Sequence, residues 1–174
     1  MAVVIRALRN VPEEIEGRAY VHYQAWREAY TGLIDQGYLD GRTLDQCRGV
    51  AYANVERNLI AKDGDRVVGF ACYGPYRDRE LPGAGEIDAL YVLADWQHRG
   101  VGRGLMRAAL ERLAEYPTVA LWVLESNARA IRFYEGCGFA RDGGVQILPM
   151  GTPVRVIRMR CRREDACRAL EMKG

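Results

Sequence analysis

Three of the chain's 19 glycines stand close together in the segment Gln97-His98-Arg99-Gly100-Val101-Gly102-Arg103-Gly104. A strand is predicted over residues 85–93 and an amphipathic helix over residues 102–116, so this segment joins a strand to the start of a helix. Successive backbone N–H groups of such a segment can converge on one anion, and the positive end of the helix dipole adds to them. The segment therefore predicts a binding site for a pyrophosphate group.

Two other phosphate-binding motifs do not fit these residues. The dinucleotide-binding pattern G-x-G-x-x-G requires a glycine where this chain has Leu105. A Walker A loop requires a G-K-[ST] sequence, which is absent. On this segment alone, an ordinary glycine-rich turn stays as the alternative.

A second group of residues with chemical potential lies between positions 118 and 139. Thr118–Leu124 is a continuous apolar run, which is typical of a strand buried on both faces. Asn127 is of a type favoured at helix N-caps, and residues 128–135 are predicted to form a short helix that ends at Gly136. Tyr134, near the end of this helix, carries a phenol that can donate a proton.

Together, the two segments resemble the GNAT superfamily of acyl-CoA-dependent N-acetyltransferases. The first segment matches the family pattern Q/R-x-x-G-x-G/A at Gln97, Gly100 and Gly102. The second matches the family's strand, asparagine, helix, tyrosine and Gly-Phe pattern at Asn127, Ala130, Tyr134, Gly138 and Phe139. An early helix with His22, Trp26 and Tyr30 is similar to one branch of small bacterial members, so the resemblance extends across the whole chain.

The resemblance implies that acetyl-CoA is the acyl donor. In the family, the strand before the glycine-rich segment offers backbone groups to the pantetheine arm, and Asn127 would contact this arm from the other side. The pyrophosphate would lie on backbone amides, with the charges of Arg99 and Arg103 close by and His98 as a further donor. The predicted cofactor-binding residues are Leu90, Tyr91, Val92, Gln97, His98, Arg99, Gly100, Val101, Gly102, Arg103, Gly104, Asn127 and Tyr134.

The reaction needs a base, because an alkyl amine has a pKa near about 10.4 and is protonated at neutral pH. Glu86 lies eleven positions before Gln97, the offset at which histone acetyltransferase members of the family place a catalytic glutamate. Asp88 shares its strand face by two-residue alternation. Glu86 is therefore the predicted base, with Asp88 as a residue that could orient a water; the alternative is a surface or salt-bridged carboxylate pair.

The reaction also needs an acid, because negative charge develops on the departing sulfur of coenzyme A. Tyr134 occupies the family's general-acid position, and its phenol can protonate that thiolate. The backbone N–H of Val92 would polarise the thioester carbonyl. Cys137 has no histidine near it in sequence, so a structural role is expected for it and no covalent enzyme intermediate is predicted.

The expected function is direct transfer of an acetyl group to a primary amine, on a small molecule or a peptide, in a ternary complex. An alternative of another class is a catalytically silent module that binds acyl-CoA, and the presence of both Tyr134 and Glu86 argues against it. The resemblance implies that the helical segment with Trp26 and Tyr30, the 74–83 loop and the 149–153 turn form the walls of the acceptor site. For His22 and Trp26 a place in the core is the stronger alternative. The sequence does not name the amine.

Composition excludes several other classes of function. The 25 Lys and Arg against 23 Asp and Glu leave a net charge of +2, so no strong field favours nucleic acid or an anionic membrane. No apolar stretch approaches the roughly 20 residues that span a bilayer. The five cysteines form no C-x-x-C and the chain has two histidines, so no metal site is expected. Scattered cysteines without a secretory leader predict a cytoplasmic protein, and the resemblance implies a homodimer.

The pattern along the 174 residues predicts one acetyltransferase domain, 1–174, with a mixed α/β (α+β) fold. A twisted mixed sheet of about seven strands is expected, flanked by about four helices. The first two helices are predicted over 12–30 and from about 44 to 58, the second with Val50, Val55 and Leu59 facing inward. Strands are predicted at 3–8, 58–62, 66–73, 85–93, 118–124, 139–148 and 154–161.

Overall fold

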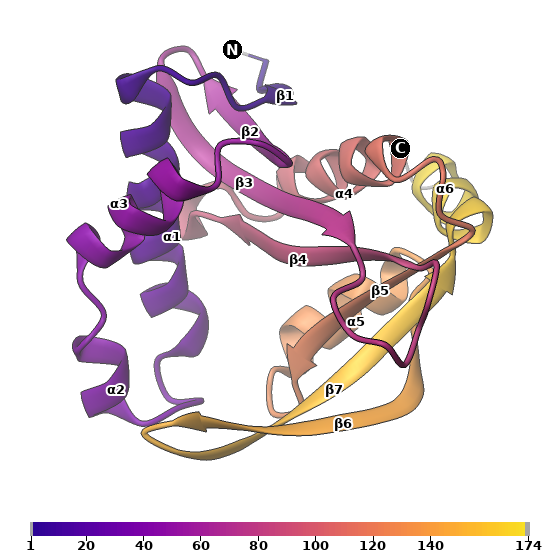
Figure 1. Cartoon of the computed structure of the whole chain (residues 1–174). Helices are drawn as coiled ribbons and strands as arrows, with labels where there is room; N and C mark the ends of the chain where they lie inside the picture. The colour runs from indigo at the N-terminus through magenta and orange to yellow at the C-terminus, as the bar shows by residue number, and fades with distance from the viewer. Residues whose placement is uncertain (1, 173–174) are drawn as a thin grey trace.

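A sheet of seven strands runs through the computed structural model, which describes residues 2–172 (Figure 1). In sheet order the strands are β1, β2, β3, β4, β5, β7 and β6. The neighbouring strands are antiparallel except for β4 and β5, which are parallel. The predicted mixed sheet of seven strands is therefore confirmed. The strands are β1 (Val4–Ala7), β2 (Asn58–Asp63), β3 (Arg66–Pro75), β4 (Gly85–Val92), β5 (Thr118–Leu124), β6 (Ala140–Met150) and β7 (Thr152–Arg162).

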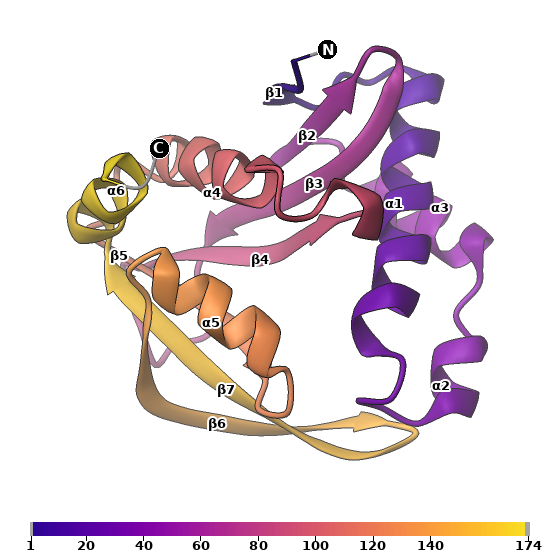
Figure 2. The same cartoon turned by 180° about the vertical axis from the view of Figure 1, so that it is seen from behind.

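The described residues form six α-helices and one short 3₁₀ helix, η1 (Ala94–Trp96). Helix α1 packs on one face of the sheet and α3 packs against α1, whereas α4, α5 and α6 lie on the other face (Figure 2). The 3₁₀ helix leads from β4 towards α4, the helix that follows the glycine-rich segment. The six are α1 (Pro12–Tyr30), α2 (Gln36–Asp40), α3 (Leu44–Ala53), α4 (Val101–Arg112), α5 (Ala128–Gly136) and α6 (Arg163–Glu171).

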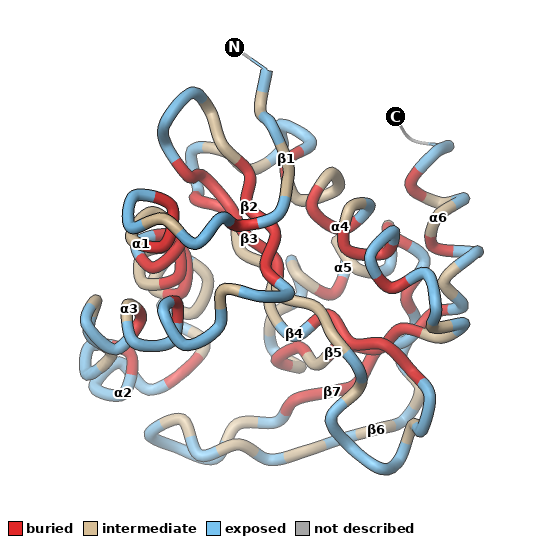
Figure 3. The backbone as a smooth tube through the Cα atoms, turned by 45° about the horizontal axis from the view of Figure 1, so that its top comes forward, coloured by how far each residue is buried: buried red, intermediate tan, exposed pale blue. Residues whose placement is uncertain are grey.

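Separate apolar clusters lie on the two faces of the sheet. Buried residues follow one another along β2 and β3 and recur along α1 and α4 (Figure 3). On one face, Leu105 and Leu110 of α4 pack with Leu121 of the central strand β5. On the other, Val21 of α1 packs with Phe70 of β3. Because β3, β4 and β5 are covered on both faces, the strands that carry the candidate site are held rigidly from either side.

The second helix is shorter than predicted and presents a different face to the core. Helix α3 ends at Ala53, and its buried side chains are Cys47 and Ala51, whereas Val50 is exposed. Asn58 starts β2, and its amide donates to the carbonyl oxygen of Asn54 at 2.6 Å. This contact stabilises the turn between α3 and β2, and the residues after Asn54 are not helical.

Two of the helices were not expected from the sequence. Helix α2 has five residues and is capped by Asp35, whose side chain accepts from the Tyr38 N–H at 2.8 Å. Helix α6 follows β7 directly and buries only Ala166 and Leu170. Helix α2 buries only Leu39, so neither helix has enough buried apolar residues to show a hydrophobic period.

The last two strands form a longer hairpin than predicted. Strands β6 and β7 continue to Met150 and from Thr152, so the turn is reduced to Gly151, whose φ of +80° suits glycine. A Cβ at Gly151 would overlap the side chain of Asp35. The hairpin tip therefore packs closely against the start of α2, next to the predicted acceptor walls (Figure 1).

His22, a residue of α1, is buried between the side chains of two arginines. Arg18 Nη1 lies 3.2 Å from its Nδ1, and Arg42 Nη2 lies 3.3 Å from its Nε2. Burial and the charges of both arginines disfavour a further positive charge, so the pKa of His22 falls from 6.5 to about 3. The imidazole is therefore neutral in the folded protein at neutral pH.

The first prediction concerns stability in acid. Between about pH 6.5 and 3 the unfolded chain binds a proton at His22 that the folded chain does not, so the free energy of unfolding falls as the pH drops. The slope is at most about 1.4 kcal/mol per pH unit. Urea denaturation of His22→Gln across this range should show a shallower slope than the parent protein.

His98 provides the matched control for this experiment, because it is the second histidine of the chain and is exposed. His98→Gln should keep the slope of the parent protein. An unchanged slope in His22→Gln would contradict the account.

Candidate active site

The candidate site lies where β4 and β5 separate. Among the described residues, these strands are paired at two positions, Gly85 opposite Val119 and Glu86 opposite Ala120. Past Glu86 a cavity of about 640 Å³ opens, lined by β4 and β5 and by α1, α4 and α5. A parallel pair of strands would otherwise continue its ladder here, so the sheet itself creates the space.

A bulge in β4 lies at the mouth of this opening. Ile87 faces Tyr73 of β3 and Ala89 faces Cys72, so Asp88 is an extra residue without an opposite partner. Bulges bend a strand and redirect its side chains, and they are frequent near active sites. Here the extra residue of the bulge is Asp88, which lines the cavity.

The glycine-rich segment forms the first turn of α4. Gly100 is the N-cap residue with φ +81°, and no side chain caps this helix. The free N–H groups of the first turn are therefore available for an anion. Gln97 Nε2 donates to the Val92 carbonyl at 2.9 Å, which fixes the segment against the end of β4.

Most of the predicted cofactor-binding residues line the cavity, and three do not. Val101 is buried in the core beneath α4, and the guanidinium of Arg99 lies over the ring of Trp96. A Cβ at Gly104 would be too close to Ile5 Cδ1, so this glycine allows α4 to pack on β1. The predicted residues that line the cavity are Leu90, Tyr91, Val92, Gln97, His98, Gly100, Gly102, Arg103, Asn127 and Tyr134.

Arg103 has contacts other than those expected from the sequence. Its guanidinium donates to the carbonyl oxygens of Gly136, at 3.3 Å, and Ala169, at 3.0 Å. Its charge therefore stabilises the C-terminal ends of α5 and α6, where carbonyl groups lack helical partners. Arg103 also lines the cavity, so its contribution of charge to a bound pyrophosphate stays a prediction.

Helix α5 forms the opposite wall. The side chain of Asn127 accepts from the Ala130 N–H at 3.1 Å, so it is a helix N-cap as its residue type predicted, and it also lines the cavity. The sequence reasoning missed Arg129 and Arg132, which lie on the cavity side of this helix. Arg129 contacts the side chains of Gln97 and His98 across the opening. The sequence signal that could have identified them is the presence of two arginines in the first turns of the helix that follows Asn127.

Tyr134 lines the same cavity from the end of α5. Its ring packs between Phe133 and Phe139, at centroid distances of 5.3 and 6.2 Å. Burial raises the pKa of the Tyr134 phenol well above its ordinary value of 10, with a further contribution from Tyr30. The phenol therefore keeps its proton throughout the neutral range.

Two further tyrosines meet on the α1 side of the cavity. The hydroxyl groups of Tyr30, from α1, and Tyr91, from β4, lie 3.0 Å apart. Both residues line the cavity, and burial raises the pKa of each phenol. Tyr30 was predicted as an acceptor wall, whereas Trp26 is buried in the core below it and does not line the cavity.

The predicted base is buried and ion-paired. Glu86 accepts two hydrogen bonds from the Arg77 guanidinium, both at 3.0 Å, and Asp88 contacts Arg77 Nη2 at 2.6 Å. Glu86 does not line the cavity, whereas Asp88 does. One guanidinium, that of Arg77, therefore joins the carboxylates of Glu86 and Asp88, and Asp88 is the member of the pair that lines the cavity.

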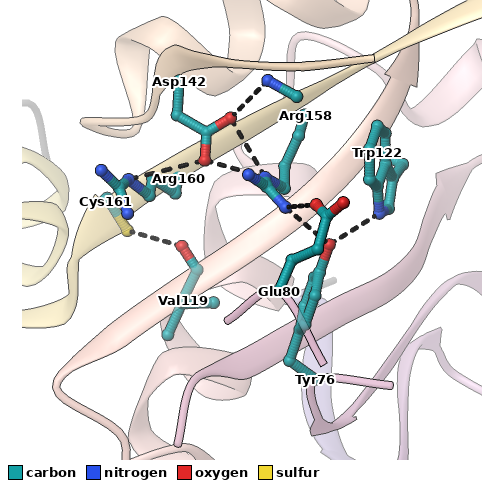
Figure 4. A network of polar contacts seen from close by, with 9 residues as sticks. Tyr76, Glu80, Val119, Trp122, Asp142, Arg158, Arg160 and Cys161 are labelled. Carbon is teal, nitrogen blue, oxygen red and sulfur yellow. Dashed lines mark hydrogen bonds and ion pairs between the residues drawn. The ribbon is translucent and has the colours of Figure 1, made fainter. Parts of the chain in front are cut away.

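A network of polar contacts supports the β5 wall (Figure 4). Trp122, which lines the cavity, donates through Nε1 to the hydroxyl of Tyr76 at 3.1 Å. Arg158 of β7 lies 3.4 Å from the same hydroxyl and pairs with Glu80 at 2.7 Å and with Asp142 at 2.8 Å. The network thus connects the predicted 74–83 wall, through Tyr76 and Glu80, to the far strands of the sheet.

Charge is unevenly distributed around the cavity. The cationic groups that line it, Arg103, Arg129 and Arg132, come from α4 and α5. The lining carboxylates are Glu28 of α1 and Asp88 of β4. Anionic phosphates are favoured on the α4 and α5 side, and a cationic group is favoured beside β4.

Comparison with known proteins agrees with this geometry. The family model described as Acetyltransferase (GNAT) family matches residues 14–139. A probable N-acetyltransferase of Mycobacterium tuberculosis is 33% identical over 147 residues, covering 80% of this chain and 82% of the relative. A Pyrococcus horikoshii protein of known structure is 26% identical with a TM-score of 0.72, covering 92% of this chain and 98% of the other.

A second solved structure, that of the PaiA N-acetyltransferase of Thermoplasma acidophilum in complex with coenzyme A, has a TM-score of 0.73. It is 18% identical and covers 93% of this chain and 99% of the other, so this likeness concerns the fold. The family match and the M. tuberculosis relative establish that the chain belongs to the acetyltransferase (GNAT) family. It is an acyl-CoA-dependent acetyltransferase, and the predicted family and fold are confirmed.

No helix among residues 2–172 is long and apolar enough to cross a membrane. No group of three or more His, Cys, Asp or Glu side chains in the same residues is placed to hold a metal ion.

The second prediction concerns the narrow gap between α4 and α5. A Cβ at Gly102 would lie 3.3 Å from the ring of Phe133, so a larger side chain would intrude between the helices beside the anion site. Gly102→Val should weaken acetyl-CoA binding about tenfold, which corresponds to about 1.4 kcal/mol. Isothermal titration calorimetry measures this affinity directly.

The control for this substitution is Gly49→Val. Gly49 is also a helical glycine, and a Cβ there meets open space. Its affinity for acetyl-CoA should equal that of the parent protein. Equal affinity in Gly102→Val as well would show that the gap does not border the cofactor.

Proposed function

We propose that the protein transfers the acetyl group of acetyl-CoA to a primary amine by direct attack in a ternary complex. One observation carries this proposal: a single cavity joins the uncapped N-terminus of α4 to a protonated tyrosine, Tyr134, and to a carboxylate, Asp88. Within one space, the three features supply an anion site, a proton donor and a proton acceptor.

The residues of this chain fit acetyl-CoA on stereochemical and electrostatic grounds. Glycine at 102 leaves the space beside Phe133 open, and the first-turn N–H groups after Gly100 suit a pyrophosphate. Arg129 and Arg132 of α5 line the same cavity and add their positive charge to that of Arg103. In this proposal the unpaired edge of β4 offers its backbone to the pantetheine arm, in the way that a strand accepts a neighbouring strand.

The proton acceptor is assigned to the carboxylate pair, with Glu86 as the predicted base and Asp88 as the member that meets the cavity. The amine must lose a proton before its lone pair can attack the thioester carbon. Asp88 can take this proton at the cavity surface, and Glu86 shares the Arg77 guanidinium with it. The pair therefore acts as one anionic unit.

The proton donor is assigned to Tyr134. As the new carbon–nitrogen bond forms and the carbon–sulfur bond breaks, negative charge moves to the leaving sulfur. A phenol is protonated at neutral pH and can deliver its proton to this thiolate. The N–H of Val92 is proposed to donate to the carbonyl oxygen while it carries charge.

The third prediction tests the proton donor. Tyr134→Phe removes the phenol and keeps the ring that packs with Phe133 and Phe139. The kcat for thiol release from acetyl-CoA should fall by about 10²-fold, the contribution expected of one general acid. The affinity for acetyl-CoA, measured by calorimetry, should change little.

Tyr20→Phe is the matched control, because Tyr20 is an exposed tyrosine of α1 that does not line the cavity. It should keep full activity with every member of an amine panel. A Tyr134→Phe variant with the parental kcat would remove Tyr134 from the mechanism. Binding of acetyl-CoA without thiol release for any amine would favour a catalytically silent module instead.

A further inference from the structure

Arg77 combines an exposed side chain with two carboxylate partners. It lies at the start of the segment that connects β3 to β4, and its side chain is 69% exposed. Even so, Nε and Nη2 donate to the two oxygens of Glu86, and Nη2 also pairs with Asp88. A solvent-exposed cation therefore covers both carboxylates next to the cavity.

The two carboxylates differ in their dependence on this cation. The side chain of Glu86 is 4% exposed, and Arg77 is the one cation paired with it among the described residues. A buried carboxylate without a cation or donors is costly, so this position must keep a positive partner. Asp88 is 45% exposed and lines the cavity, so it is the side of the pair that an incoming molecule can reach.

We propose that Glu86 and Asp88 form an ammonium-binding subsite for the acceptor, and that Arg77 occupies this subsite in competition with the acceptor. The inference rests on the proposed function, since it concerns the amine of the same reaction. An ammonium group brings three N–H donors and one positive charge, which can replace the bonds and the charge that Arg77 supplies. The exchange keeps the buried Glu86 compensated, and the displaced Arg77 side chain is already mostly in water.

The subsite also defines a class of acceptor. Two carboxylates beside the reacting nitrogen repel a carboxylate carried next to that nitrogen. Amines without a neighbouring carboxylate, such as linear polyamines and the side chain of lysine in a peptide, are therefore preferred over free α-amino acids. An ammonium held between these carboxylates is also placed to pass a proton to Asp88 before attack.

The fourth prediction is a change in amine affinity that requires no turnover. Spermidine, a linear polyamine without a carboxylate, is titrated into the full chain by calorimetry in the absence of acetyl-CoA. Arg77→Ala and Arg77→Gln should each bind spermidine about tenfold more tightly than the parent protein, because the internal competitor is removed. Asp88→Asn should bind it about tenfold more weakly.

Arg79→Ala is the matched control, since Arg79 is an exposed arginine two residues further along the same segment. It removes the same charge from the same loop and should leave spermidine affinity unchanged. L-alanine, which carries a carboxylate next to its amine, should bind more weakly than spermidine to every variant. Melting curves for both Arg77 variants show whether each is folded, and Arg77→Gln keeps hydrogen-bond donors if alanine destabilises the loop.

The outcomes separate this inference from the proposed function. Tighter spermidine binding in the Arg77 variants supports the subsite even if no amine is acetylated. Three results would overturn it. The parent protein and both Arg77 variants could bind spermidine equally well, Arg79→Ala could bind it as tightly as the Arg77 variants, or no variant could bind it. If turnover occurs, Arg77→Ala should lower the KM for spermidine; an unchanged KM would overturn the subsite and leave the transferase intact.

Discussion

Two residue pairs, Gly85 with Val119 and Glu86 with Ala120, are the positions at which β4 and β5 are joined among the described residues. The rest of the site depends on this early separation. Past Glu86, the β5-facing edge of β4 has no strand partner, and the cavity opens between the two strands. The flanking helices then place their polar ends at this opening: α4 with an uncapped first turn and α5 with Asn127, Arg129 and Tyr134. Packing on both faces of the sheet keeps the separated strands in place.

The charges around the cavity follow from which element supplies each wall. The arginines come from α4 and α5, where phosphates are expected, and the carboxylates come from α1 and β4. Arg77 neutralises the buried carboxylate of Glu86 from a loop, whereas Arg158 is itself held inside a network with Asp142 and Glu80. The two arginines thus have different roles. The exposed Arg77 can be displaced by an ammonium group, whereas the buried Arg158 supports Trp122 through the hydroxyl of Tyr76.

Much of this arrangement could be predicted from the sequence, because its signals are local. The strand order of the hairpins, the glycine-rich turn into α4 and the N-cap at Asn127 each depend on neighbouring residues, and the structure confirms them. Contacts between segments that are distant in sequence could not be predicted. Nothing near Arg103 in sequence indicates that its guanidinium contacts the end of α6, and nothing near Gly104 indicates Ile5. The same limit hid the pairing of Glu86 with Arg77 and the approach of Gly151 to Asp35.

The central claim is that the space between the separated strands receives coenzyme A. A crystal structure of the complex with coenzyme A tests it most directly. The account predicts the pyrophosphate within hydrogen-bond distance of backbone N–H groups in the first turn of α4, and the pantetheine arm between β4 and β5 beside Leu90–Val92. Coenzyme A bound on another surface, with no contact to β4 or to the first turn of α4, would contradict it.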